Sequence, residues 1–442
     1  LKAFRDRFGI PIPDDKLEEL PFYKPEPDSP EMKYLLKSRE KLGGFVPQRR
    51  SRSFSIPTPP LETLKAILDG TGEREISTTM AFVRILSQLV KDKDLGSRIV
   101  PIIPDEARTF GMEGMFRQLG IYSSVGQLYQ PVDKDQVMFY REDKKGQILE
   151  EGINEAGAMS SWIAAATAYS NHNQPMLPFY VFYSMFGFQR IGDLAWAAGD
   201  SRARGFLIGG TAGRTTLNGE GLQHEDGHSH ILASTIPNCR TYDPTYAYEM
   251  AVIIREGIRQ MTEEQQNVFF YLTAMNEAYA QPAMPQGVED GIIKGMYLLE
   301  EDQRDAACHV QLMGSGAILR EVREAAKILR EDYNIGADVW SVTSFNELRR
   351  EGLAVERRNR LHPEQKPELT YVEQCLSGRR GPVVASTDYM KLFADQIRQW
   401  VPVKEYKVLG TDGFGRSDSR KKLRHFFEVD RYWVVLTALE AL

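Results

Sequence analysis

Three histidines lie close together in the glycine-rich stretch 217–230, and they are His224, His228 and His230. Because imidazole titrates near neutral pH, a histidine in such a stretch can shuttle a proton or orient an anionic substrate. The segment 224–228 also matches the H-E-x-x-H pattern of zinc hydrolases, which needs both histidines on one face of a helix. The glycines before and inside this segment predict a loop instead. A zinc hydrolase using His224 and His228 therefore stays a minor alternative, as does a purely structural role for the histidines.

Three carboxylates are further candidates for proton transfer or ligand binding. Glu155 begins a predicted helix of small residues, where it is either a proton-exchanging acid or a carboxylate that only caps the helix. The strand-like run 98–103 brings Asp105 and Glu106 to its carboxyl end. Open α/β sheets bind their ligands at that edge, so we expect these acids near a site.

The elements that must position these residues alternate along the chain. Apolar runs predict buried strands at 98–103, 176–183, 310–313, 338–342, 382–386 and 406–409. Apolar residues at helical spacing predict helices at 78–90, 156–166, 318–329 and 389–400. This alternation is typical of an α/β fold with doubly wound, mostly parallel sheets. Before it, frequent prolines predict an extended connector, and between its elements the polar stretch 130–147 predicts a solvated loop or a lid.

Composition excludes several classes of protein. The chain has 442 residues, of which 26% are charged and 42% hydrophobic, and no apolar run approaches the roughly 18 residues of a membrane span. Its net charge of −6 argues against a nucleic-acid partner. Three widely spaced cysteines predict neither a disulfide framework nor a cysteine-rich zinc site: Cys239, Cys308 and Cys375. We expect a cytoplasmic protein with no membrane or nucleic-acid partner.

Several unbroken blocks carry a family resemblance that covers almost the whole chain, namely 104–118, 145–158, 183–199, 209–231, 384–393 and 409–419. In these blocks the chain resembles the decarboxylating dehydrogenase component of the bacterial pyruvate dehydrogenase complex in its homodimeric form. That family lies within the transketolase-like superfamily. The resemblance implies a thiamine-diphosphate enzyme that decarboxylates pyruvate and transfers the acetyl unit to a lipoyl group.

The same resemblance implies roles for individual residues. Glu155 would face the aminopyrimidine nitrogen of thiamine diphosphate, and Tyr183 and Phe186 would form the aromatic wall on which that ring rests. His224 would line the substrate side of the thiazolium and assist reaction with the lipoyl disulfide. Two acids would lie near the cofactor and the subunit interface, and they are Asp105 and Glu106.

The resemblance also implies how the chain is divided and what it needs. It assigns residues 1–55 to the proline-rich connector, 56–285 to a pyrimidine-binding domain and 286–442 to a transketolase-like carboxyl-terminal domain that mainly supports dimerisation. The family's Gly-Asp-Gly motif, which holds magnesium and the diphosphate, has no counterpart in this sequence. This chain should therefore hold no metal ion itself and should contain half of each site.

The implied partners are pyruvate, the lipoyl domain of the dihydrolipoyl acetyltransferase component, the amino-terminal diphosphate-binding half and a second copy in a homodimer. Two alternatives stay open at this point. One is a non-catalytic dimerisation or scaffold module of the same fold, and the other is an enzyme acting on a different 2-oxo acid, since pocket size selects the substrate.

Overall fold

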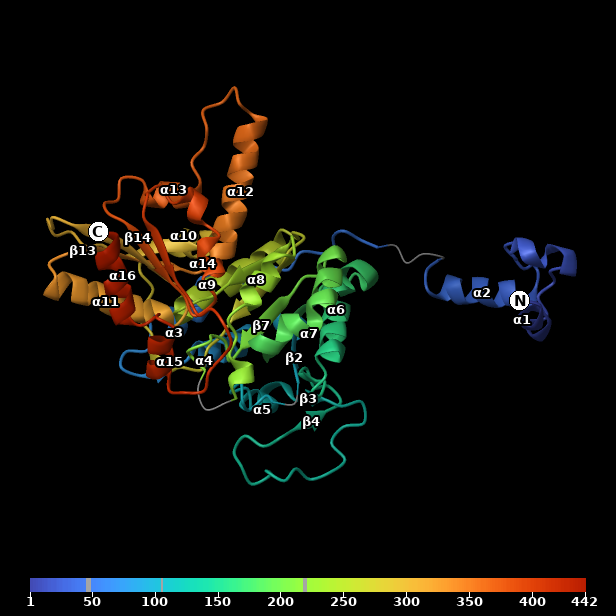
Figure 1. Ribbon diagram of the computed structural model, residues 1–442. Helices are drawn as coiled ribbons and strands as arrows, with labels where there is room; N and C mark the ends of the chain where they lie inside the picture. Colours follow the sequence, from blue (N-terminus) through green and yellow to red (C-terminus); the bar gives the residue numbers. More distant parts are fainter. Residues whose placement is uncertain (45–48, 105, 218–220) are drawn as a thin grey trace.

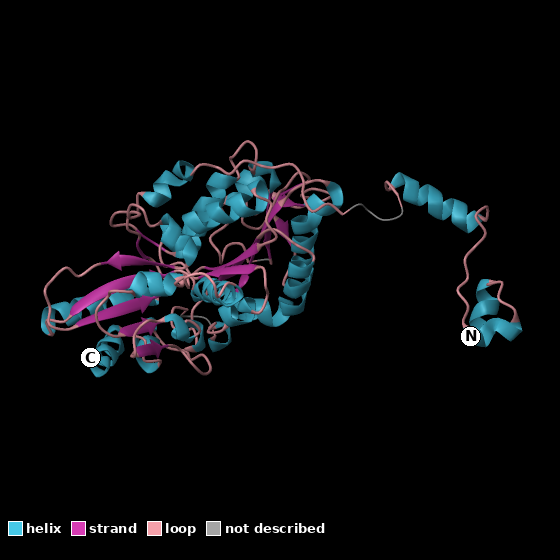
Figure 2. Ribbon diagram, turned by 90° about the horizontal axis from the view of Figure 1, so that it is seen from above, coloured by secondary structure: helices cyan, strands magenta, loops and turns pink. Residues whose placement is uncertain are grey.

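The computed structural model describes residues 1–44, 49–104, 106–217 and 221–442 (Figure 1). Two large β-sheets, of six and five strands, organise most of this chain. Figure 2 shows helices packed against the strands of both sheets. No helix among the described residues is long and apolar enough to span a bilayer.

The first large sheet is entirely parallel, with the strand order β5-β2-β6-β7-β9-β8. Its strands are β2 (Ile99–Ile103), β5 (Leu149–Glu150), β6 (Leu177–Tyr183), β7 (Phe206–Gly210), β8 (Cys239–Tyr242) and β9 (Phe269–Thr273). Along β6, Phe179 and Val181 belong to one hydrophobic cluster, and Tyr180 and Phe182 to another. Since successive side chains of a strand point to opposite faces, both faces of this sheet must be covered.

Helices provide that cover on the two faces of the six-stranded sheet. Helices α4 (Thr78–Leu89) and α9 (Ala247–Ile258) contribute to the first cluster, whereas α6 (Glu155–His172) and α7 (Ser184–Asp200) contribute to the second. Parallel strands with a continuous apolar run need such double cover, because their side chains are shielded from water on both faces only when helices pack on both faces of the sheet. The predicted doubly wound arrangement is confirmed for this sheet.

The second large sheet has the order β11-β13-β12-β14-β15 and is parallel except at the edge strand β11. Its strands are β11 (Met296–Glu300), β12 (His309–Gly314), β13 (Gly336–Val342), β14 (Val383–Ser386) and β15 (Tyr406–Leu409). Helices α11 (Ile318–Asp332) and α16 (Arg431–Ala441) share one hydrophobic cluster with it, and α12 (Phe345–Leu361), α13 (Tyr371–Leu376) and α14 (Leu392–Asp395) share another. The prediction of mostly parallel sheets is therefore confirmed here as well.

The other elements belong to neither large sheet. They are α1 (Lys2–Phe8), η1 (Asp14–Glu19), α2 (Pro30–Lys41), η2 (Leu61–Leu64), α3 (Lys65–Leu68), β1 (Glu75–Ile76), η3 (Gly96–Arg98), α5 (Met115–Leu119), β3 (Ile121–Tyr122), β4 (Glu142–Asp143), η4 (Leu222–His224), α8 (Ser229–Ser234), η5 (Arg259–Glu263), β10 (Tyr279–Ala280), α10 (Glu289–Lys294), η6 (Arg398–Trp400) and α15 (Arg420–Phe426). Strands β1 and β10 pair antiparallel, and β3 and β4 pair parallel.

Two local predictions were wrong. The first 44 residues are not uniformly extended, because α2 forms with Ser29 as its N-cap and proline at its first position, where proline is tolerated. The predicted helix 389–400 is only the four residues of α14 followed by the turn η6. Phe393, Ile397 and Trp400 are buried at helical spacing although the α-helix ends at Asp395, so the spacing alone was misleading.

Candidate functional site

The carboxyl ends of four neighbouring parallel strands carry the residues that the sequence selected. Glu106 follows β2, Glu155 follows β5, Tyr183 ends β6, and His224 lies in the segment that follows β7. Because parallel strands share one carboxyl edge, segments far apart in sequence meet at this edge. Asp105 lies outside the described residues.

Tyr183, Phe186 and His224 form an aromatic group at this edge. The ring centroid of His224 lies 5.0 Å from that of Tyr183 and 4.8 Å from that of Phe186. Both pairs are edge-to-face, an arrangement in which the positive edge of one ring meets the negative face of the other. The Tyr183 hydroxyl donates a hydrogen bond to the Glu106 carboxylate. The structure thus brings together four of the predicted site residues.

Glu155 joins this group through Arg190, which the sequence did not single out. The guanidinium of Arg190 pairs with the Glu155 carboxylate and lies 4.4 Å from the ring centroid of Phe186. Glu155 does not cap helix α6, because the Asn154 side chain accepts the hydrogen bond from the backbone amide of Gly157 at 3.1 Å. The capping interpretation of Glu155 was therefore wrong, and its carboxylate is paired with Arg190 instead.

The other two histidines have separate environments. A ring nitrogen of His228 lies 2.8 Å from the Gln189 side-chain amide nitrogen. His230 is fully buried, with its ring stacked on Phe393 at 4.8 Å and a ring nitrogen 3.0 Å from the Thr273 hydroxyl. Burial lowers the pKa of His230, so its imidazole is neutral at physiological pH. His230 is thus a core residue, as the structural interpretation of the cluster predicts.

The zinc-hydrolase alternative is wrong in this geometry. Turn η4 ends at His224, Glu225 is extended, and α8 begins only at Ser229, so His224 and His228 do not share a helical face. Within the described ranges, no group of three or more His, Cys, Asp and Glu side chains could hold a metal ion. The loop that the glycines predicted is confirmed.

The second sheet also contributes to this region, through Asp388 in the loop after β14. The Asp388 carboxylate is completely buried and accepts hydrogen bonds from the Thr215 amide at 2.8 Å and from the hydroxyls of Thr215 and Thr216 at 2.6 and 2.5 Å. Burial raises the pKa of Asp388, and the Arg424 guanidinium acts in the opposite direction. The sequence analysis did not identify Asp388 as a site residue. The sequence pointed to it only by its place within the block 384–393, which carries part of the family resemblance.

Glu225, the neighbour of His224, is a second residue that sequence reasoning missed. Its side chain is buried, with 3% of the residue exposed, and its carboxylate accepts a hydrogen bond from the backbone amide of Arg416 at 2.7 Å. Burial raises the pKa of Glu225 to about 7, against the lowering effect of the Arg416 amide. The residue that follows the candidate histidine in the sequence therefore has a carboxyl group whose pKa burial raises toward neutrality.

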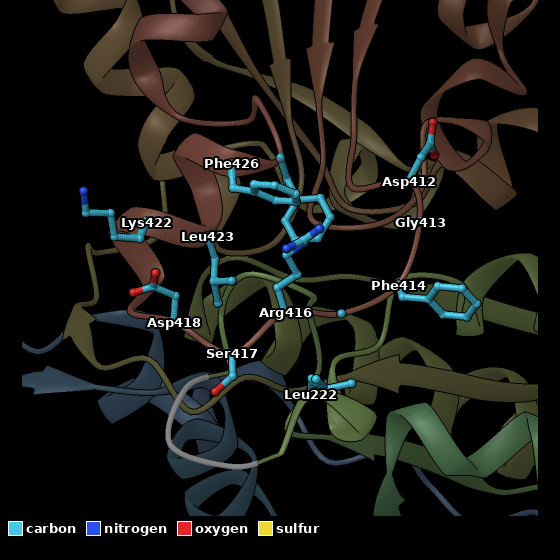
Figure 3. Close-up of a pocket in the computed structure, with 12 residues that line it drawn as sticks. Leu222, Asp412, Gly413, Phe414, Arg416, Ser417, Asp418, Lys422, Leu423 and Phe426 are labelled. Atoms are coloured by element: carbon cyan, nitrogen blue, oxygen red, sulfur yellow. The ribbon is translucent and has the colours of Figure 1, made fainter.

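A cavity of 580 Å³ adjoins the His224 segment on the side of the second sheet (Figure 3). Leu222, two residues before His224, forms one wall, and the loop 412–418 and helix α15 form the rest. The guanidinium of Arg416 lies 4.3 Å from the ring centroid of Phe426 within this lining, while Phe414 is almost fully exposed. Apolar side chains line this open space together with two cations, Arg416 and Lys422, and two acids, Asp412 and Asp418.

Comparisons with known proteins show which families this sequence is similar to. A family profile described as the pyruvate dehydrogenase E1 component middle domain matches residues 55–282, and one described as the transketolase-like TK C-terminal domain matches residues 295–430. The chain is 82% identical over its whole length to a Pseudomonas aeruginosa protein named pyruvate dehydrogenase E1 component, and 58% identical to the Escherichia coli K12 protein of that name. It spans about half the length of these relatives, 50% in both cases.

Solved structures of transketolases share the fold. The transketolase of Leishmania mexicana matches 93% of this chain with a TM-score of 0.64 and 16% sequence identity, and 50% of that chain is covered. A split-gene transketolase, described as an inactive beta4 tetramer, matches 84% of this chain and 99% of its own with a TM-score of 0.54 and 15% identity. At such identities the likeness concerns the fold, and it agrees with the predicted transketolase-like architecture.

Proposed function

The chain belongs to the pyruvate dehydrogenase E1 component family, and we propose that it supplies the pyrimidine-binding half of a thiamine-diphosphate site. The observation that carries this proposal is one continuous group of contacts at the carboxyl edge of the six-stranded sheet. It runs from Glu155 through Arg190 and Phe186 to His224 and Tyr183. A flat heteroaromatic ring needs an aromatic wall and one acid at its nitrogen, and this group contains both.

Each residue of the group has a role that its position allows. When bound, the cofactor supplies the electron sink for loss of carbon dioxide from pyruvate. Glu155 would share a proton with the pyrimidine ring nitrogen of the cofactor, and Arg190 pairs with its carboxylate. Tyr183 and Phe186 orient the ring, with the Tyr183 hydroxyl fixed by Glu106. Asp105, which lies outside the described residues, is proposed near the cofactor and the subunit interface on the strength of the family resemblance alone.

His224 is proposed to act on the substrate side. Its ring is held edge-on by two aromatic rings, which limits its rotation. A protonated imidazole in that place can donate its proton to the thiolate that leaves when attack on the lipoyl disulfide breaks the S–S bond. The proposed reaction is decarboxylation of pyruvate followed by acetylation of the lipoyl domain of the dihydrolipoyl acetyltransferase component.

Magnesium and the diphosphate are assigned to the other half of the site. In the part of the chain that the structure describes, no cluster of three possible metal ligands is present, whereas a diphosphate-bound magnesium needs several oxygen ligands. We propose that the amino-terminal half common to the longer relatives provides them, in a homodimer. The proposed division is a connector at 1–55, a pyrimidine-binding domain at 56–285 and a carboxyl-terminal domain at 286–442, and the proposed location is the cytoplasm.

The test is Glu155→Gln in the full-length protein, with Asp193→Asn as a matched control. Asp193 is an exposed acid on α7, the helix that carries Arg190. Glutamine cannot exchange the proton, so pyruvate turnover should fall by roughly 10²–10⁴-fold while the circular dichroism spectrum is unchanged. The control should keep its activity.

Two results would count against the proposal. Normal turnover by Glu155→Gln would remove Glu155 from cofactor activation. Failure of the unmodified full-length protein to bind thiamine diphosphate, measured by calorimetry with magnesium present, would favour a scaffold of the same fold.

A further inference from the structure

The two loops that follow β14 and β15 hold the segment that carries His224 on both sides of that residue. On the amino-terminal side, the Asp388 carboxylate accepts three hydrogen bonds from Thr215 and Thr216. On the carboxyl-terminal side, the Gly227 carbonyl accepts a hydrogen bond from the Met390 amide at 2.8 Å. The position of the His224 segment is therefore determined by the five-stranded sheet as well as by β7, from which the segment emerges.

Arg214 adds a connection between the same parts. Its buried guanidinium donates hydrogen bonds to the carbonyl of Thr411 at 2.7 Å and to that of Gly413. It also packs against the backbone after His224, since a Cβ on Gly227 would lie 2.5 Å from the guanidinium carbon. The loop 411–416 and the His224 segment are thus joined by a buried cation.

Glu225, which follows His224 in the sequence, also contacts the loop after β15. Its carboxylate accepts the hydrogen bond from the Arg416 amide, and the neighbouring Gly415 fits closely between the two flanks of the histidine. A Cβ on Gly415 would lie 2.5 Å from the Leu222 carbonyl oxygen and 2.8 Å from a carboxylate oxygen of Glu225. Since Leu222 and Glu225 bracket His224, a shift of this loop must move the histidine.

We propose that Glu225 is a positioning residue, which fixes the backbone at Arg416 and thereby sets the direction in which His224 presents its imidazole. This assigns the carboxyl-terminal unit a part in the active site beyond dimerisation. The inference rests on the proposed function of His224. Glu225 touches no reacting atom in this scheme, because its carboxylate is turned toward the loop 415–416.

The decisive experiment is a double-variant cycle in the full-length enzyme with thiamine diphosphate and magnesium. Acetyl transfer to a lipoyl domain is measured for Glu225→Ala, His224→Ala and the double variant. A misplacement of about 1 Å in a catalytic group costs on the order of 100-fold, so Glu225→Ala should lower kcat by roughly 10- to 100-fold. The double variant should be no slower than His224→Ala alone, because a positioning residue has no effect once the residue it positions is gone.

Three further variants separate positioning from general loss of stability. Glu225→Gln keeps an oxygen that can accept from the Arg416 amide, so it should restore most of the activity. Gly415→Ala displaces the loop without removing the carboxylate and should reproduce the defect, which also covers the case in which Glu225→Ala fails to fold. The matched control is Glu351→Ala, since Glu351 accepts a hydrogen bond from the Tyr371 backbone amide at 2.9 Å in the same way but within the carboxyl-terminal unit.

Hydrogen–deuterium exchange of the cofactor-free protein gives a readout independent of activity. Peptides covering 221–230 and 411–417 should exchange faster in Glu225→Ala and Gly415→Ala than in Glu351→Ala. Multiplicative effects of Glu225→Ala and His224→Ala, or unchanged exchange in 221–230, would overturn the inference. These results differ from failure of the proposed function, in which Glu155→Gln and His224→Ala would both retain normal turnover.

Discussion

Replacement of Glu225 by glutamine should change how the stability of the protein depends on pH. The carboxyl group has an ordinary pKa of 4.5, and burial raises this pKa to about 7 in the folded protein, where Asp388 also raises it and Arg214 and the Arg416 amide lower it. The folded state therefore holds the proton more tightly than the unfolded state. The stability contributed by this group is complete below about pH 4.5 and is lost as the pH rises through about 7.

The size of the effect follows from the two pKa values. Each pKa unit corresponds to about 1.4 kcal/mol, so ionisation of buried Glu225 should cost roughly 3 kcal/mol of stability by pH 8. Glutamine is neutral at every pH and can still accept the Arg416 hydrogen bond. The variant should therefore match the wild type near pH 5 and exceed it at pH 8 by up to roughly 3 kcal/mol, or several degrees in Tm.

Thermal unfolding of wild type and Glu225→Gln at pH 5, 6, 7 and 8 measures this difference directly. The informative control is Asp302→Asn, because the Arg304 guanidinium holds the pKa of Asp302 well below its usual range. That variant should be less stable than the wild type over this whole pH range. A constant difference between Glu225→Gln and wild type from pH 5 to pH 8 would refute the reasoning.

Three further substitutions test the packing around the site. Asp388→Ala leaves three buried donors of Thr215 and Thr216 without their acceptor, and should lower the free energy of unfolding in urea by about 2–5 kcal/mol; a loss below 1 kcal/mol would contradict this. Gly187→Ala would place a Cβ 2.0 Å from the Phe182 ring, and overpacking of this kind should lower Tm by an amount equivalent to about 1–3 kcal/mol. Trp162→Phe removes the indole donor to the Phe206 carbonyl at 3.0 Å and should cost about 1–3 kcal/mol, whereas unchanged urea unfolding would show that the bond is dispensable.

Local patterns in the sequence were enough to predict six of the eleven strands in the two large sheets, and β5, β7, β8, β9 and β11 were not predicted. The run 176–183 is apolar throughout and forms β6, whose two faces are both buried. The glycines around 224–228 predicted a loop, and the chain there is a short turn followed by extended backbone. These features depend on side-chain periodicity and on backbone preferences of neighbouring residues, which are properties of a short segment.

Interactions between distant segments limited the other predictions. Asn154 rather than Glu155 caps helix α6, although the sequence analysis considered only Glu155 as a cap. The apolar residues of 389–400 are spaced as in a helix, but Tyr389 and Phe393 pack on the ring of His230 in helix α8, and only Leu392–Asp395 form an α-helix. Tertiary packing outweighed the local pattern in this case.

The sequence by itself determined the class of fold, the acids and the histidine of the proposed site, and the family to which they belong. Only the tertiary structure revealed that Arg190 links Glu155 to the aromatic group and that Glu225 is bound to the loop at Arg416. The physical reason is that strand order is set by the burial of whole sheet faces. The strand order in turn decides which strand ends lie next to one another, and therefore which loops meet at the site.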